Sequence, residues 1–497
     1  MSAPIGARAA RRCGAALLTV LALSSADDAR AAGGYYSGTK GARAAGRAGA
    51  FVAKADDVTA AAVNPAGLAG VGGTVVQVGN RFSYNYFAYD RATTRDYGNV
   101  SAGVAPEVSF DTVENEQPFQ LLDPLIGAAT NFGLRDFGFA LYVHAPPGIG
   151  RLEFPVDGGQ RYMMVSREAI FLSYSASAAY KYRDVFGVGL SLAWIHVPRL
   201  KYSLVIDGAP FPGEANPVSS PLDMQATPDG ADPFTLNAII GAWVRPAPFL
   251  QVGLSAQVIP SEVVTDSELT VTPLNDVRGE IVLRRNDERA NDVTVSLPLP
   301  LTFRGGVRYI GLEGTKERYD LELDVEYETW SRVGQFTLET NDLEADLDGQ
   351  IVPIGRIDIE KHWQDTVAVR LGGDYAVLPD KLTMRGGLAY ETATSPAEYY
   401  HVDFASGAMF GAALGASMFF GNLELAAAYE LRVQPAASIS EAEGRVYQEN
   451  PASPCEPPYT VDSGCSEYYE GQPAPTVNGG EYWAQSHMLS IDAIYRF

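Results

Sequence analysis

The C-terminal residues 486–497 alternate between two kinds of side chain with a period of two. One row is His487, Leu489, Ile491, Ala493, Tyr495 and Phe497, and the other is Ser486, Met488, Ser490, Asp492, Ile494 and Arg496. A β-strand points successive side chains to opposite faces. An apolar row beside a mostly polar row is typical of a strand that separates lipid from a polar interior. We therefore expect residues 486–497 to form a transmembrane β-strand.

The composition agrees with a membrane protein made of strands. The chain is 46% hydrophobic, with 26 Tyr, 21 Phe and 50 Gly. After residue 31 it has no run of about 18 apolar residues, which a membrane-spanning helix would need. In hydrocarbon only helices and closed barrels give every backbone N–H and C=O a partner. A water-soluble β-sandwich also alternates, but it would not explain why short and long turns follow each other regularly. The sequence predicts an all-β membrane protein.

From Thr74 onward, short and long connections alternate strictly. The short ones lie near 133–136, 182–184, 246–248, 311–316, 378–381 and 421–422, and the long ones near 90–105, 144–166, 203–232, 262–291, 331–355, 392–404 and 434–480. Six short and seven long connections separate 14 strands, with both termini of the chain on the short-turn side. Outer-membrane barrels have an even number of antiparallel strands, short periplasmic turns and long outer loops. We expect a 14-stranded antiparallel transmembrane β-barrel.

The first 31 residues have the features of a secretory signal. Arg8, Arg11 and Arg12 precede a short apolar run at 15–26, and residues 29–31 read Ala-Arg-Ala. A basic start, a short apolar stretch and an A-x-A site are typical of a signal peptide that is removed. A terminal aromatic residue on the last strand resembles the address of bacterial barrel proteins. We predict the outer membrane of a Gram-negative bacterium as the location.

Charge and cysteines limit the partners. The formal net charge is −23, and a strongly acidic chain is a poor nucleic-acid binder. After the predicted signal two cysteines remain, Cys455 and Cys465, in a loop-like stretch. In an oxidising compartment we favour a disulfide between them over two free thiols.

Residues 41–69, GARAAGRAGAFVAKADDVTAAAVNPAGLA, resemble the start of the outer-membrane long-chain fatty acid transport family (FadL-like), which includes uptake proteins for aromatic hydrocarbons. Three later segments resemble strands of that family in the same order. These are VSLPLPLTFRGGVRY at 295–309, VEYETWS at 325–331 and LTMRGGLAYE at 382–391. The resemblance therefore extends over essentially the whole chain after the signal.

The resemblance implies a 14-stranded barrel closed by an N-terminal hatch. Residues 32–73 would form the hatch inside the lumen, and residues 74–497 the barrel. The Ala- and Gly-rich composition of the segment suits close passage along an interior wall. Within it, Asn64, Pro65 and Ala66 are candidate gating residues. Pro65 fixes its own φ and favours an extended Asn64, so we expect Pro65 to keep the segment from becoming helical. The alternative is that these three residues form only a turn.

One strand, residues 319–330, carries an acidic row on its inner parity: Asp320, Glu322, Asp324, Glu326 and Glu328. Such a row needs cationic partners. Neighbouring strands offer Arg304, Arg308, Arg356, His362, Arg370 and Arg385. We favour a structural wall of Arg–carboxylate pairs over a proton or substrate relay. A metal site is less favoured, because carboxylates at i and i+2 on a flat strand do not wrap a cation.

On three earlier strands the residues that are predicted to face inward have small side chains. Gly138, Gly187 and Gly189 belong to this wall, together with several Ser and Ala. The family has a third strand that bends inward and opens the wall sideways, and Gly138 with Pro146-Pro147 fits such a weak strand. The glycines could equally serve close packing of the hatch. The sequence leaves both readings open.

No catalytic pattern accompanies these features. The five histidines do not combine with a nucleophile and an orienting group, and zinc spacings and phosphate loops are missing from the sequence. We predict no enzyme activity, no cofactor and no metal. The resemblance implies a passive channel for hydrophobic molecules, with long-chain fatty acids as the default substrate and hydrocarbons next. The alternative is a barrel of the same family that acts as a surface interaction or secretion-associated protein. We expect a monomer surrounded by outer-membrane lipid and lipopolysaccharide.

Overall fold

The computed structural model describes residues 41–96, 106–145, 150–207, 218, 222–276, 279–347, 349–404, 406–449 and 476–497. Three sequence-based predictions lie outside these residues. They are the signal peptide at 1–31, the pairing of Cys455 with Cys465, and the Pro146-Pro147 pair on the third strand.

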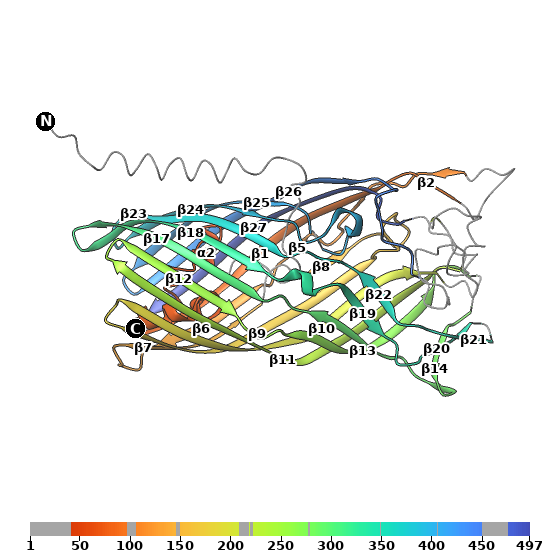
Figure 1. Cartoon of the computed structure of the whole chain (residues 1–497), viewed down its shortest axis with the longest axis horizontal. Helices are drawn as coiled ribbons and strands as arrows, with labels where there is room; N and C mark the ends of the chain where they lie inside the picture. The colour runs from red at the N-terminus through yellow and green to blue at the C-terminus, as the bar shows by residue number, and fades with distance from the viewer. Residues whose placement is uncertain are drawn as a thin grey trace.

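The described residues form a closed antiparallel barrel of 14 passes, as predicted (Figure 1). In chain order the passes are β1 (Thr74–Arg91); β4 (Val113–Glu114), β5 (Phe119–Gln120) and β6 (Pro124–Thr130); β7 (Phe137–His144) and β8 (Arg151–Glu153); β9 (Ser166–Tyr182); β10 (Phe186–Ile206); β11 (Met224–Ala247); β12 (Leu250–Gln257) and β13 (Glu262–Pro273); β16 (Asp292–Pro298) and β17 (Thr302–Glu313); β18 (Lys316–Glu328) and β19 (Gln335–Glu339); β22 (Ile357–Glu360) and β23 (Thr366–Leu378); β24 (Leu382–Glu391); β25 (Met409–Phe420); β26 (Leu423–Ile439); and β27 (Gly480–Arg496).

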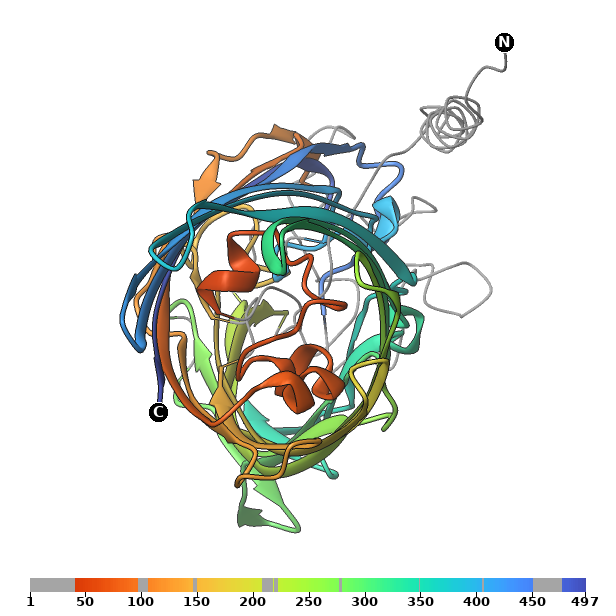
Figure 2. The ribbon, with the colours of Figure 1, turned by 90° about the vertical axis from the view of Figure 1, so that its left-hand side faces the viewer.

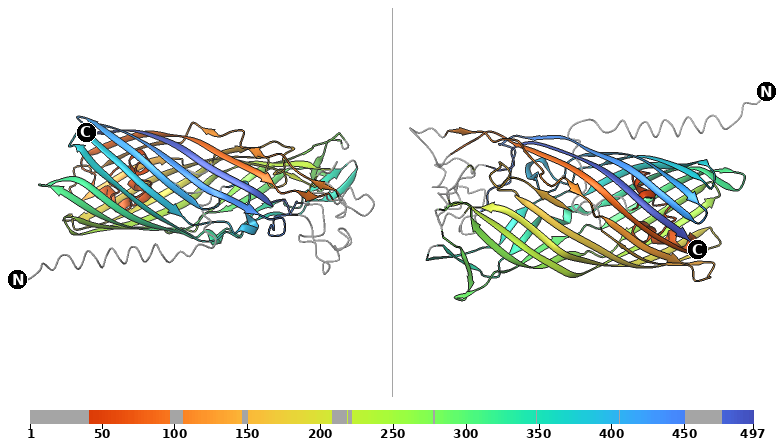
Figure 3. Two further views of the ribbon diagram at one scale, coloured as in Figure 1. Left: turned by 90° about the horizontal axis from the view of Figure 1, so that it is seen from above. Right: turned by 180° about the vertical axis from the view of Figure 1, so that it is seen from behind.

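The first and last strands close the barrel. β1 pairs with β27 over its length, from Val75 opposite Arg496 to Arg91 opposite Gly480. Closure leaves no unpaired edge, which a bilayer would not tolerate. The chain end lies at the same end of the barrel as the short turns, and the strands are tilted against the barrel axis (Figure 3).

The alternation predicted for β27 holds in the structure. Leu489, Ile491 and Tyr495 are exposed on the outer face, whereas Ser490 and Asp492 are buried in the lumen. The remaining passes also expose large apolar side chains on the outer face of the barrel. This apolar outer face suits contact with lipid tails. Among the described residues, none of the helices is long and apolar enough to span a membrane.

Passes 7 to 10 are interrupted at the same height. Pro260 separates β12 from β13, and Pro298 and Pro300 flank the break between β16 and β17. Proline has no N–H to donate to the sheet, so a strand stops or bulges there. The 3₁₀ turn η4 (Trp330–Arg332) interrupts the next pass, and residues 361–365 the one after. At these breaks the residues between the strands turn into the lumen. Leu299 and Trp330 are completely buried there.

The barrel is longer on its outer side than the sequence predicted. The predicted extents of the loops at 203–232 and 262–291 were wrong, because parts of both ranges belong to strands. Residues 224–231 of β11 pair with residues 273–266 of β13, because this part of the wall continues beyond the lipid-facing belt. A second sheet of β15 (Glu288–Arg289), β14 (Val282–Arg285), β20 (Glu344–Leu347) and β21 (Gln350–Pro353) projects from the same end, where β2 (Thr94–Arg95) and β3 (Glu107–Val108) also pair (Figure 1).

Deleting Phe497 should impair barrel assembly rather than transport through assembled protein. The N–H of Phe497 donates to the Thr74 carbonyl (2.8 Å) and completes the last register of β27 on β1. The measurement is the fraction of heat-resistant, folded barrel in outer-membrane extracts. The conservative variant Phe497→Tyr is the control and should assemble normally. Equal amounts of folded truncated and full-length protein would contradict the prediction.

Candidate transport site

The N-terminal segment, residues 41–73, lies within the ring of strands at the short-turn end (Figure 2). It contains three short helices, α2 (Ala42–Ala45), α3 (Ala60–Val63) and the 3₁₀ helix η1 (Pro65–Gly70). Most of its residues are buried, and many are alanines that pack on small residues of the wall. The segment therefore fills much of the lumen at this end.

Glycines of the wall allow this close packing. A Cβ added at Gly138 would lie 2.1 Å from the Leu68 carbonyl oxygen, and one at Gly189 would lie 2.5 Å from the Ala66 nitrogen. At Gly187 the added atom would instead meet the indole nitrogen of Trp243 at 2.5 Å. Any side chain at these positions would push the N-terminal segment or Trp243 away. The structure thus gives Gly138 and Gly189 a packing role against the segment.

The candidate gating residues make neutral hydrogen bonds. The Asn64 amide nitrogen donates to the carbonyls of Val52 (2.9 Å) and Ala242 (3.1 Å), and its oxygen accepts from the Ala66 N–H (3.2 Å). The Trp243 indole donates to the Ala66 carbonyl (3.0 Å). Asn64 is extended, as the following proline favours. The expectation that Pro65 prevents a helix was wrong. Pro65 is the first residue of η1, where its missing N–H costs nothing.

Arg47 connects the N-terminal segment to the acidic row. Its guanidinium lies 2.6 Å from a carboxylate oxygen of Asp320, 2.6 Å from one of Asp374 and 2.9 Å from one of Glu322. Its Nε donates to the Ala50 carbonyl (2.7 Å). The side chains of Arg47, Asp320 and Glu322 are all 0% exposed. Charges buried to this degree are tolerated because each has close partners of opposite sign.

Backbone groups of the same segment complete this contact. The N–H groups of residues 51 and 52 donate to Asp324 (2.7 and 2.9 Å), and those of residues 53 and 54 donate to Glu322 (2.6 and 3.3 Å). Successive N–H groups arranged in this way bind anions. The Lys54 ammonium adds an ion pair to Asp320 (2.6 Å). The first three carboxylates of the acidic row, Asp320, Glu322 and Asp324, are therefore the docking surface for residues 47–54.

Arginines of the barrel itself also pair with the row, at Asp320 and at Glu326. Arg304 pairs with Glu326 on the neighbouring strand, Arg370 approaches Glu326 from the other side (2.8 Å), and Arg308 pairs with Asp320 (2.6 Å). These three arginines lie where the strand parity predicted. The wall is thus shared between barrel arginines and cations of the N-terminal segment.

Three of the proposed partners do not reach the row. Arg385 pairs with Asp374 (3.3 Å) and Glu424 (3.5 Å) instead, because its strand, β24, is separated from β18 by β23. The other two are Arg356 and His362. Arg356 pairs with Asp358, and His362 lies 3.4 Å from Glu360, with about half of both side chains exposed. Their expected contact with the row was wrong, because residues 354–362 belong to the outer part of pass 10 rather than to the strand beside β18. The last carboxylate of the row, Glu328, accepts a hydrogen bond from the Trp330 indole (2.8 Å).

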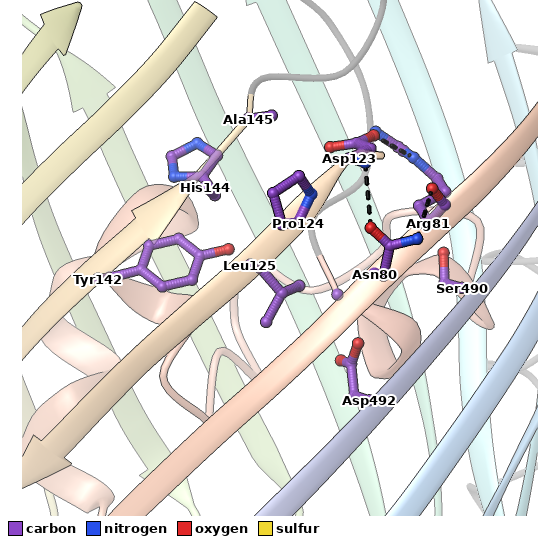
Figure 4. A pocket seen from close by; sticks show the side chains of 11 residues that line it. Asn80, Arg81, Asp123, Pro124, Leu125, Tyr142, His144, Ala145, Ser490 and Asp492 are labelled. Carbon is purple, nitrogen blue, oxygen red and sulfur yellow. Dashed lines mark hydrogen bonds and ion pairs between the residues drawn. The ribbon is translucent and has the colours of Figure 1, made fainter. Parts of the chain in front are cut away.

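A small polar pocket of about 290 Å³ lies where β1, β6, β7 and β27 meet the start of the N-terminal segment (Figure 4). Arg81 and Asp123 pair along its rim. Asp492 accepts from the Ala42 N–H (2.7 Å), and its second oxygen and the Tyr142 hydroxyl are buried without a hydrogen bond from any described residue. Arg81, Asp123 and Asp492 bring charged groups into the lining, so the pocket does not suit a purely apolar substrate.

An apolar chamber lies in the outer part of the lumen. The empty space within it, together with the part open to solvent, is about 710 Å³. The lining comes from β9, β10, β11, β16, β19, β22 and the segment before β25, and consists of Arg167, Ala169, Phe171, Leu200, Tyr202, Leu204, Ala226, Pro228, Val295, Leu297, Phe336, Thr337, Leu338, Ile357, Ile359 and Phe404. Sites for small molecules are typically concave and mostly apolar with a few polar groups, and this chamber fits that description.

Arg167 is the charged residue of the chamber lining. Its guanidinium donates to the Asp403 carbonyl (2.6 Å) and lies 4.2 Å from the Phe404 ring centre. The Arg167 Nε is buried and has no hydrogen-bond partner among the described residues. A buried N–H without a partner is destabilising. The guanidinium therefore retains the capacity to bind an acceptor inside the chamber.

A buried ion pair holds the segment that carries Phe404. Asp403 lies 2.6 Å from the Lys361 ammonium and 2.9 Å from His401 Nδ1, and each of these three side chains is at most 4% exposed. Burial alone would raise the pKa of Asp403, but His401 and Lys361 hold that pKa well below its usual range. Burial lowers the pKa of His401. The segment 401–404 is thereby fixed against the inner end of the chamber.

The sequence did not identify Arg47, Lys54, Arg167 or Asp374 as site residues. Arg47 and Lys54 carried a usable signal, because they are charges in a segment of Ala and Gly that must be buried. Arg167 and Asp374 carried none, since each is one of many charges at strand positions. Among the described residues, no group of His, Cys, Asp and Glu side chains is arranged to hold a metal ion.

Comparisons with known proteins agree with this architecture. Residues 23–450 match the model of the family described as outer membrane protein transport protein (OMPP1/FadL/TodX). A Pseudomonas aeruginosa FadL homologue superposes with a TM-score of 0.72 at 16% identity, covering 94% of this chain and 100% of that chain. The Pseudomonas putida toluene transporter TodX gives 0.61 at 12% identity, with 92% and 99% covered.

The Ralstonia pickettii toluene transporter TbuX gives a TM-score of 0.58 at 13% identity, covering 92% of this chain and 98% of that chain. At such low identities these likenesses concern the fold. A search among curated protein sequences finds no match. The chain belongs to the OMPP1/FadL/TodX family of outer membrane transport proteins, and its location is the outer membrane of a Gram-negative bacterium.

Proposed function

We propose that this protein is a passive channel that carries hydrophobic molecules across the outer membrane, with long-chain fatty acids as its principal substrates. The observation that carries the proposal is the apolar chamber in the outer part of the lumen, whose empty space is about 710 Å³ when the part open to solvent is included. Transfer of an apolar solute from water into such a chamber is favourable by about 25 cal/mol for each Å² of apolar surface that is buried. Uptake then needs no energy source beyond the concentration gradient.

A fatty acid matches the chamber better than an uncharged hydrocarbon does. The guanidinium of Arg167 has an unpartnered buried N–H at the chamber wall. A carboxylate could accept from that N–H while the alkyl chain contacts Ala169, Phe171 and Leu297. Charge-assisted hydrogen bonds of this kind are the stronger ones. TodX and TbuX are named as toluene transporters, so aromatic hydrocarbons are the second substrate class.

The proposed route continues from the chamber towards the N-terminal segment, which would act as the hatch. Asn64, Pro65 and Ala66 would gate it, because their contacts with the wall are neutral hydrogen bonds that a small shift can break. The glycine wall at Gly138, Gly187 and Gly189 would then be the place where substrate leaves sideways. We also propose that the protein works as a monomer in contact with lipid and lipopolysaccharide.

Replacing Arg167 by Met should weaken the binding of fatty acids and leave hydrocarbon binding nearly unchanged. A hydrogen bond to a charged group contributes about 1.5–3 kcal/mol, which corresponds to roughly a 10- to 100-fold loss in affinity. The measurement is displacement of a fluorescent fatty acid from purified protein in mild detergent, with an alkane of equal length as the control ligand. Equal losses for both ligands would show that Arg167 only shapes the chamber.

Analysis of lipids that co-purify with the protein tests the substrate class directly. Free fatty acids bound in stoichiometric amounts would support the proposal, and aromatic hydrocarbons taken up instead would favour the second class. If neither class binds and uptake by cells is unaffected by loss of the protein, the channel proposal fails. The barrel would then be better explained as a surface interaction protein.

A further inference from the structure

The small polar pocket of Figure 4 holds a buried carboxylate, Asp492, that forms no ion pair with any described residue. Asp492 is 1% exposed. Its Oδ2 accepts from the Ala42 N–H (2.7 Å) and from the Gln77 side-chain nitrogen (2.9 Å). Its Oδ1 is buried and accepts no hydrogen bond from the described part of the chain. Taking a carboxylate out of water costs free energy that an opposite charge offsets in most proteins.

The arginines around the pocket pair with other carboxylates. Arg81 pairs with Asp123 along the rim. Arg43, the neighbour of Ala42 in the chain, pairs with Asp56 (2.9 Å) and Asp57 (3.1 Å). The charge of Asp492 therefore needs a cation from another source.

His144 also lines the pocket, but it lies too far along the sheet to supply that charge. Across the sheet Asp492 is opposite Gly79, Gly79 is opposite Leu125, and Leu125 is opposite His144. Asp492 and His144 are thus three strand spacings apart, or about 14 Å between their backbones. The Leu125 side chain lines the pocket between them.

Two further buried polar atoms make no hydrogen bond with a described residue. They are the side-chain oxygen of Gln77 and the hydroxyl of Tyr142. Gln77 is 0% exposed and Tyr142 is 1% exposed. The orientation of the Gln77 amide is fixed, because its nitrogen donates to Asp492. Its oxygen is then the atom without a donor, and the phenolic oxygen of Tyr142 offers lone pairs as well.

Two glycines leave room for these groups to converge. Gln77 lies opposite Gly127, which lies opposite Tyr142. A Cβ added at Gly79 would lie 2.1 Å from the Asp492 Oδ1, and one at Gly127 would lie 2.9 Å from the Tyr142 ring. Asp492 and Tyr142 therefore lean over the glycines from opposite sides, towards β1 and β6. Figure 4 shows both side chains directed into the pocket.

The oxygens gathered here suit a monovalent cation. They comprise one carboxylate oxygen, one amide oxygen and one phenolic oxygen, and the Ser490 hydroxyl also lines the pocket. Calcium sites combine more oxygen ligands and usually several carboxylates. The described residues contain no group of three or more His, Cys, Asp or Glu side chains that could hold a metal ion. A single positive charge balances the single charge of Asp492.

We propose that this pocket binds a monovalent cation, Na⁺ or K⁺, between Asp492, Gln77 and Tyr142, and that the bound ion stabilises the docked N-terminal segment. The ion neutralises the carboxylate that accepts from the N–H of Ala42, the first residue of α2. Gly41 of the same segment lines the pocket, so the pocket is complete only when the segment is docked. Ion binding and docking are therefore thermodynamically linked. The site is independent of which substrate crosses the barrel.

The experiment measures release of the segment in purified full-length protein at constant ionic strength, with Na⁺ or K⁺ replacing choline. The methyl groups of choline keep oxygen ligands away from its charge. The readout is thiol labelling of Ala45→Cys, with the other cysteines replaced by serine, because Ala45 is 1% exposed. At a cation concentration of about ten times its dissociation constant, the released fraction should fall about tenfold. Sodium NMR line broadening in the unmodified protein measures binding directly.

Two variants remove parts of the site. Asp492→Asn keeps the shape of the side chain and an oxygen that can accept from Ala42, but it removes the charge, so labelling should no longer depend on Na⁺ or K⁺. Tyr142→Phe removes one ligand and should raise the half-saturating concentration about tenfold. Glu430→Gln is the matched control and should retain the full dependence. Glu430 is a carboxylate of the neighbouring strand β26, 2% exposed, that pairs with Arg432 (2.7 Å).

The results separate a bound cation from the alternatives. Labelling that responds equally to choline, or that remains dependent on Na⁺ and K⁺ in Asp492→Asn, overturns the proposal. Absence of sodium line broadening in the unmodified protein also overturns it, and a protonated Asp492 or an ordered water then explains the pocket. If Asp492→Asn does not assemble, Tyr142→Phe and the sodium measurement decide. Failure of the protein to bind fatty acids would refute the channel proposal and leave this site unaffected.

Discussion

Replacing Arg47 by Met is expected to release residues 41–54 from the barrel wall while the barrel itself still assembles. Arg47 is the cation between Asp320, Glu322 and Asp374, and its side chain is 0% exposed. Removing one partner of a buried ion pair leaves charge uncompensated and costs about 3–5 kcal/mol. Such a loss changes the docking equilibrium by more than about a hundredfold. The strands keep their own hydrogen bonds, so assembly does not depend on this contact.

The measurement is thiol labelling of Ala45→Cys in protein whose native cysteines are replaced by serine. Ala45 is 1% exposed, so labelling reports release of the segment. Arg199→Met is the matched control. Arg199 also pairs with two carboxylates, Asp229 (2.7 Å) and Glu168 (3.3 Å), but its side chain is 41% exposed, and exposed pairs contribute about 0–1 kcal/mol. Labelling that is equally slow in both variants would show that Arg47 does not hold the segment.

Tying residue 64 to the barrel wall is expected to abolish uptake of a labelled fatty acid by cells. A suitable pair is Asn64→Cys with Gly241→Cys. A Cβ added at Gly241 would lie 3.1 Å from the Asn64 Cγ, which approximates the position of a cysteine sulfur. The disulfide would prevent the gating residues from moving away from β11. Reduction should restore uptake in the same protein, which makes each sample its own control.

A second disulfide distinguishes gating from general stiffening. Asn85→Cys with Ser486→Cys joins β1 to β27, where the two residues are directly opposite each other and the Ser486 hydroxyl donates to the Asn85 amide oxygen (2.9 Å). This bond lies within the wall and does not involve residues 41–73. It should leave uptake unchanged under oxidising and reducing conditions. Unchanged uptake with the tether between positions 64 and 241 fully formed would refute gating by residues 64–66.

The sequence by itself determined the barrel. The side chains of a membrane strand alternate between lipid and lumen, and successive strands are joined by turns. The 486–497 pattern and the spacing of the short connections therefore follow from local rules. They yielded 14 strands, the short-turn side as the place where β1 begins and β27 ends, and the inward orientation of Asp320 to Glu328. The lengths of the outer strands were missed, since beyond the lipid belt polar residues pair as well as apolar ones. β13 was therefore taken for a loop.

Only the tertiary structure decided what the lumen contains. The acidic row showed that cationic partners were needed, but not which residues supply them. Strand parity tells which face of the strand a side chain is on, but not which distant segment packs against that face. Arg47 and Lys54 reach the row from more than 260 residues away in the sequence. The apolar cluster beside the chamber arises where the chain is interrupted on four passes, and two of these interruptions place Trp330 and Trp363 in the lumen. That coincidence depends on the register between strands, a long-range property that no local pattern records.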